Sequence, residues 1–151
     1  MNMPSGTFLT LNADWHTVTF ALNLGPAFAL LLFSAGPICA TANIMLANNI
    51  CDLEKDIAVG RYTLSYFLGR QALHVFAGLY YITYLAWAAS VALNILSPVC
   101  LLALLTIIPV HKNILRFRKE QIKEETFALS VQNYILIAGA QTLVIFLSGL
   151  I

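Results

Sequence analysis

Long uncharged apolar stretches alternate with short polar segments along this chain. The stretches that the pattern predicts as membrane-spanning helices lie near residues 26–50, 72–93, 96–111 and 127–150. Residues 71–110 carry no Asp, Glu, Lys or Arg, and a segment of that length holds two spans of about twenty residues each. Asn94, Ser97 and Pro98 provide a turn between them. The pattern therefore predicts an all-α polytopic transmembrane helix bundle of about four spans, forming one domain over residues 1–151.

The first of these spans is expected to begin at Gly25-Pro26 and to bend at Gly36-Pro37, because proline removes a backbone hydrogen bond inside a helix. Residues 1–25 carry Trp15 among polar side chains and are expected at the outer membrane interface. Both a loop and a partial helix are compatible with that segment.

Composition strengthens the membrane prediction. Apolar residues make up 60% of the chain and charged residues 10%, with a mean hydropathy of +0.80, whereas a soluble globule of this size needs more charge to face water. The net charge of +1 gives no global field that would attract nucleic acid. Cys39, Cys51 and Cys100 lack metal-binding spacing and are expected to be reduced structural thiols.

The basic residues are confined to two segments. They are Lys55, Arg61 and Arg70 in the first, then Lys112, Arg116, Arg118, Lys119 and Lys123 in the second. The positive-inside rule places both in the cytoplasm, and the turn at 94–98 and both chain ends on the other side. We therefore expect a multi-pass protein of the cell (plasma) membrane, with a cytoplasmic motif loop at 51–70 and a second cytoplasmic loop at 111–125. The mixed charges of residues 116–125 are typical of a solvated face, and no site is assigned there.

Polar side chains extend the first span beyond its apolar part. At about 100° per residue, Asn49, Asp52 and Asp56 fall within about 60° of one another on a helix, and Asn48 lies beside them. Two carboxylates one turn apart repel each other, and a bound cation would offset that repulsion. Mg²⁺ suits such a site because it accepts carboxylate oxygens together with water and substrate phosphates. An ordinary solvated acidic face is the alternative reading.

Glycines and arginines follow these acids closely. The segments are Val59-Gly60-Arg61-Tyr62-Thr63-Leu64 and Phe67-Leu68-Gly69-Arg70. Arg61 and Arg70 are candidates to bind phosphate oxygens, and the alternative is that they anchor the loop at anionic lipid headgroups.

This combination resembles the intramembrane aromatic prenyltransferases of the UbiA superfamily, and within it the 1,4-dihydroxy-2-naphthoate polyprenyltransferases of menaquinone biosynthesis. Residues 48–56, with Gly60 to Leu64 and Leu68-Gly69, are similar to the second aspartate motif of that branch and the cytoplasmic loop after it. A looser likeness extends to the basic stretch 113–123 and to Gln132-Asn133 and Gln141 in the last span. The resemblance implies a nine-helix fold of which this chain is the C-terminal part.

Members of that family use two aspartate-rich motifs to hold Mg²⁺ ions, which bind the diphosphate of a polyprenyl diphosphate. The resemblance implies that Asp52 and Asp56 are catalytic metal ligands and that Asn48, Asn49 and Arg61 bind the diphosphate. The implied cofactor is Mg²⁺, and the implied partners are polyprenyl diphosphate, an aromatic acceptor and the lipid bilayer. In the naphthoate branch the prenyl group replaces the ring carboxyl, which leaves as CO₂.

The chain departs from the family in carrying one aspartate motif. The only acidic residue among residues 1–47 is Asp14, which is not part of an aspartate motif. We therefore expect the chain to be inactive alone and to need the missing N-terminal half as a partner. The alternatives are a prenyltransferase of the same superfamily with another aromatic acceptor, and a non-enzymatic small membrane protein that binds or assembles partners. A CDP-alcohol phosphatidyltransferase is disfavoured because Asp52 is followed by Leu53 and not by glycine.

Overall fold

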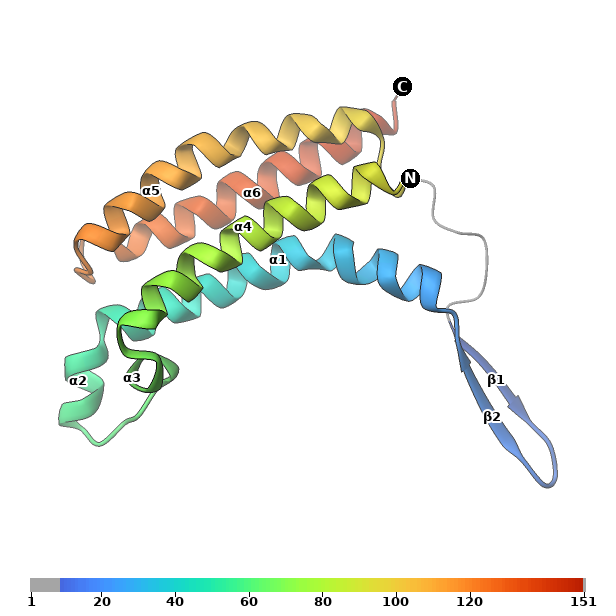
Figure 1. The fold of residues 1–151 in the computed structure, drawn as a ribbon, viewed down its shortest axis with the longest axis horizontal. Coiled ribbons are helices and arrows are strands. Elements are labelled where there is room, and N and C mark those ends of the chain that lie inside the picture. Colours follow the sequence, from blue (N-terminus) through green and yellow to red (C-terminus); the bar gives the residue numbers. More distant parts are fainter. Residues whose placement is uncertain (1–8, 151) are drawn as a thin grey trace.

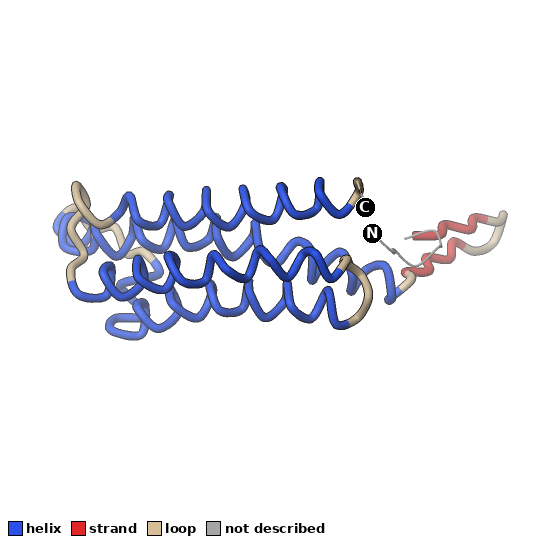
Figure 2. Tube along the Cα trace, turned by 90° about the horizontal axis from the view of Figure 1, so that it is seen from above, coloured by secondary structure: helices blue, strands red, loops and turns tan. Residues whose placement is uncertain are grey.

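The computed structural model describes residues 9–150, and within them a β hairpin precedes a bundle of helices. The strands are β1 Leu9–Ala13 and β2 Val18–Leu22, and the helices are α1 Leu24–Cys51, α2 Leu53–Ala58, α3 Leu64–Leu68, η1 Gly69–Gln71 (3₁₀), α4 Ala72–Ala92, η2 Pro98–Thr106 (3₁₀), α5 Ile107–Lys119 and α6 Phe127–Ser148. The long helices run alongside one another, with α2 and α3 at one end of the bundle and the hairpin at the other (Figures 1 and 2).

Four helical stretches are long and apolar enough to cross a membrane, which confirms the number of spans predicted from the sequence. They are Leu24–Cys51, Leu64–Ala92, Pro98–Lys119 and Phe127–Ser148. The third is longer than expected, because α5 continues through the basic segment to Lys119. It does so by burying Val110, Ile114 and Phe117, which recur every three or four residues and so share one helix face. Of the predicted loop 111–125, only the part after Lys119 lies outside helices.

Helix α1 continues through Pro37, and Figure 1 shows that the helix is bent along its length. It packs against both α4 and α6. Gly36 brings α1 so close to α6 that a Cβ added there would lie 2.7 Å from Gln141 Oε1. The two helices run antiparallel, so a second contact lies further along the pair. Lys123, just before α6, meets Asn48 near the end of α1.

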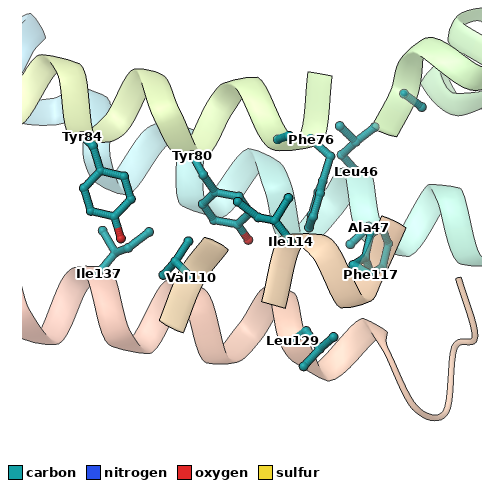
Figure 3. Packing of buried hydrophobic residues seen from close by; sticks show 12 residues of the cluster. Leu46, Ala47, Phe76, Tyr80, Tyr84, Val110, Ile114, Phe117, Leu129 and Ile137 are labelled. Carbon is teal, nitrogen blue, oxygen red and sulfur yellow. The ribbon is translucent and has the colours of Figure 1, made fainter. Parts of the chain in front are cut away.

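The core lies where α4, α5 and α6 meet α1. Phe76 and Tyr80 extend from α4 toward α5 and α6 (Figure 3), and both are fully buried. The Phe76 ring lies 4.5 Å from that of Phe117 in α5, centroid to centroid. Aromatic pairs at such distances add specific attraction to the burial of their area. This packing fixes α5 and the segment after it relative to the end of α1.

The hairpin is the one departure from an all-helical chain among the described residues. The sequence of residues 1–25 is compatible with a loop or a partial helix, whereas the structure pairs residues 9–13 with residues 18–22 as two antiparallel strands. The Asp14 N–H donates to the Thr17 carbonyl oxygen across the connecting turn, at 2.8 Å. The expectation for residues 1–8 lies outside the described part of the chain.

Candidate functional site

The end of α1 holds the polar residues that the sequence singled out. α1 ends at Cys51, and Asp52 separates it from α2 with φ −95° and ψ 6°. Helical spacing nevertheless persists across this break. The Asp52 N–H donates to the Asn48 carbonyl at 3.0 Å, and the Asp56 N–H donates to the Asp52 carbonyl at 2.8 Å. Asn48, Asp52 and Asp56 therefore stand on successive turns, and we call residues 48–61 the motif segment.

Asp52 and Asn48 converge on a single positive charge. The Lys123 ammonium donates to both Asn48 Oδ1 and Asp52 Oδ2. The side chains of Lys123 and Asp52 are 29% and 21% exposed, so water screens this ion pair only in part. A carboxylate and an amide oxygen that already share one cation have the donor chemistry of a cation site.

Lys123 is the residue that the sequence analysis missed, because its segment mixes both charges as a solvated face would. Its backbone position is fixed by Thr126, whose hydroxyl accepts from the Ile122 N–H at 2.9 Å and which is 2% exposed. The ammonium also lies 5.0 Å from the centre of the Phe127 ring, close enough for a cation–π attraction. A Thr three residues after a Lys, directly before a long apolar run, was the only local signal for this turn.

Asp56 belongs to a second, looser ion pair. Arg61 Nη1 lies 3.8 Å from Asp56 Oδ1, and the two side chains are 70% and 12% exposed. The turn that returns Arg61 to Asp56 passes through Gly60 at φ +73°, a conformation that favours glycine. The Arg61 N–H closes the turn by donating to the Asp56 carbonyl at 2.8 Å. The backbone of Arg61 is thus held by this turn, while its guanidinium is open to solvent.

Asn49 supports the site through its backbone carbonyl, which helps to hold α3 in place. Its carbonyl accepts a hydrogen bond of 2.7 Å from the buried Ser65 hydroxyl, and that hydroxyl lies 3.1 Å from the Thr63 hydroxyl. These contacts hold α3 against the last turn of α1. The structure therefore brings Asn48 and Asp52 together, keeps Asp56 one turn away with Arg61, and places Asn49 in a supporting position.

The ligand set for a metal ion is partial. Within residues 9–150, no three His, Cys, Asp or Glu side chains gather closely enough to hold one. The oxygens of Asp52, Asp56 and Asn48 are hard donors, which suit Mg²⁺. Mg²⁺ requires octahedral coordination, so water, substrate phosphates or further protein groups must supply its remaining ligands.

A pocket of about 590 Å³ opens on the other side of the motif segment. Its lining includes apolar and polar side chains, among them Ile50, Cys51, Leu53, Glu54, Lys55, Arg70, Leu73 and Gln121. Glu54 lines this pocket, whereas Asp52 does not. Among the candidate site residues, Arg70 lines the pocket, whereas Asn48, Asn49, Asp52, Asp56 and Arg61 do not. The pocket and the two ion pairs are therefore separate features.

No protein-family model, no curated protein and no solved structure matches this chain.

Proposed function

We propose that this chain is the C-terminal part of a Mg²⁺-dependent aromatic prenyltransferase of the UbiA type. The complete enzyme moves a polyprenyl group from its diphosphate to 1,4-dihydroxy-2-naphthoate in menaquinone biosynthesis. It is a nine-helix protein of the plasma membrane with the motif segment in the cytoplasm. The single observation that carries the proposal is the convergence of Asn48 Oδ1 and Asp52 Oδ2 on one cation, with the Asp56 carboxylate one turn away.

In the proposed reaction, the allylic C–O bond of the prenyl diphosphate breaks and its electron pair leaves with the diphosphate. Asp52 and Asp56 would hold Mg²⁺, which would supply electrostatic stabilisation of that departing charge. Arg61 is 70% exposed and can turn from Asp56 to a diphosphate oxygen, where a guanidinium binds well. The ring carbon bearing the carboxylate attacks the allylic cation. The bond to that carboxylate then breaks, CO₂ leaves, and the bonding electrons restore the aromatic ring.

Binding of a non-reactive substrate analogue tests this function. We expect the chain in lipid nanodiscs to bind farnesyl thiodiphosphate with Mg²⁺ and to lose at least tenfold in affinity when EDTA removes the metal, measured by isothermal titration calorimetry. Farnesol, which lacks the diphosphate, is the matched ligand control and should bind equally with and without Mg²⁺. Binding of the analogue that is indifferent to Mg²⁺ would contradict the metal-dependent function.

No turnover is expected from the 151-residue chain supplied with dihydroxynaphthoate, because one aspartate motif provides half of the family's metal ligands. Turnover by the purified chain would instead mean that two copies complete a site.

Lys123 should compete with the metal for Asp52. In Lys123→Met the competing ammonium is gone, and we expect Mg²⁺ to bind about fivefold tighter, because a partly screened ion pair is worth about 1 kcal/mol. Lys119→Met is the matched control, since it removes the same charge from an exposed position at the end of α5. Both variants are titrated with Mg²⁺ alone by calorimetry.

Weaker Mg²⁺ binding in Lys123→Met would favour the non-enzymatic alternative. Both aspartates of the motif segment already face a basic side chain, Lys123 at Asp52 and Arg61 at Asp56. The Lys123–Asp52 pair can serve as a structural tie between the end of α1 and the turn before α6, and the Arg61–Asp56 pair as a brace of the turn after α2, in a membrane protein that assembles with partners.

A further inference from the structure

We propose that the β hairpin of residues 9–22 lies along the membrane surface at the end of the bundle opposite the motif segment, with its apolar face against lipid. This surface is distant from the motif segment (Figure 1), and the inference does not depend on the proposed function.

The hairpin has one apolar and one mostly polar face. Successive residues of a strand point to opposite faces, and directly opposed residues of two strands share a face. The opposed pairs Leu9 with Leu22, Leu11 with Phe20 and Ala13 with Val18 therefore form a wholly apolar face. The pairs Thr10 with Ala21 and Asn12 with Thr19 form the other face.

The apolar face is uncovered by the rest of the described chain. The relative exposure of its large side chains is 50% for Leu22, 56% for Leu11 and 68% for Phe20, and Trp15 in the turn is 100% exposed. The hairpin projects from the end of the bundle in both views (Figures 1 and 2). A lone two-stranded hairpin is marginally stable in water, so this face needs an apolar contact.

The short connection to α1 keeps the hairpin close to the lipid. A single residue, Asn23, separates β2 from α1, and its side chain accepts from the Gly25 N–H at 3.3 Å as the helix cap. α1 is apolar from its first residue, Leu24, so its start lies at the edge of the hydrocarbon region. The hairpin is tied to that edge, and Figure 1 shows it turning steeply away from the direction of the helices.

The side chains of the hairpin match the zwitterionic interface. Residues 9–25 contain no Lys or Arg, so this segment has no lysine or arginine to attract anionic lipid. Trp15 in the turn is the type of side chain that concentrates at membrane interfaces. Each strand has five residues, which corresponds to a length of roughly 17 Å. An upright hairpin would hold Trp15 that far above the lipid, whereas a hairpin lying flat keeps it at the headgroups.

Depth-dependent quenching of Trp15 distinguishes these arrangements. The full chain is placed in phosphatidylcholine nanodiscs, and its emission minus that of Trp15→Phe isolates Trp15 from the buried Trp87. We expect nitroxides high on the acyl chain to quench Trp15 more than nitroxides near the chain end. Aqueous iodide should quench it at least threefold less than a free tryptophan analogue. Replacing part of the lipid with phosphatidylglycerol should change neither result.

Two neighbouring substitutions provide the matched control. Phe20→Glu puts a charge on the apolar face and should raise iodide quenching of Trp15 at least twofold, whereas Thr19→Glu puts it on the polar face and should leave quenching unchanged. Iodide quenching equal to that of free tryptophan, with no lipid quenching, would overturn the proposal. Protection from both quenchers would also overturn it, because the face would then be covered by protein.

Discussion

Asp52→Asn should weaken Mg²⁺-dependent binding of farnesyl thiodiphosphate about 100-fold. The substitution keeps the shape of the side chain and an oxygen that accepts from Lys123, so the fold should persist. It removes the carboxylate charge that would hold the metal, and a loss of that size corresponds to about 2.7 kcal/mol. Asp56→Asn should have an effect in the same direction, because its carboxylate lies one helical turn away. Titration calorimetry in nanodiscs measures both.

Glu54→Gln is the matched control for that experiment. It removes the same charge from the same segment, but Glu54 lines the pocket on the other side. We expect its affinity to stay within threefold of the unsubstituted chain. Equal losses in Asp52→Asn and Glu54→Gln would show that general negative charge, and not a metal site at Asp52, controls binding. Unchanged affinity in both aspartate variants would refute their role as ligands.

Phe76→Ala should lower the free energy of unfolding by about 3 kcal/mol, a typical cost of removing a buried aromatic ring. Phe76 is 0% exposed, and its ring packs against Phe117 and Tyr80 with centroids 4.5 and 5.2 Å away. The cavity would lie inside the bundle, where surrounding side chains relax only partly. Unfolding by sodium dodecyl sulfate in mixed micelles measures the change.

Phe146→Ala in α6 is the companion variant for stability. Phe146 is 66% exposed on the bundle surface, so lipid or detergent can fill the space that its ring leaves. The free energy of unfolding should change by less than about 1 kcal/mol. Similar losses in both variants would mean that the ring at position 76 is not part of a packed core.

Local features of the chain were enough to predict the spans. Hydropathy over about twenty residues decides whether a helix can cross a membrane, and the four predicted stretches correspond to the four apolar helices. A bend in the first span, which contains Pro37, and the turn-by-turn spacing of Asn48, Asp52 and Asp56 were predictable for the same reason, since both follow from backbone geometry within a few residues.

The first strand of the hairpin carries a weak local signal in the sequence. Leu9, Leu11 and Ala13 alternate with polar residues, as a strand with one apolar face does. In a chain so rich in apolar residues, that alternation is short beside the long helical stretches. Pairing of this segment with residues 18–22 became evident only from the register in the structure.

The sequence by itself determined four apolar spans, the place of the polar segment at the end of the first, and the residue types that could bind a cation there. Only the tertiary structure decided that Lys123 meets Asn48 and Asp52, that Arg61 turns back to Asp56, and that the pocket opens on the opposite side. The physical reason is the distance along the chain over which each interaction acts. Hydropathy and helical spacing act within a few turns, whereas the Lys123 contact spans 71 residues of sequence and depends on how α6 packs against α1.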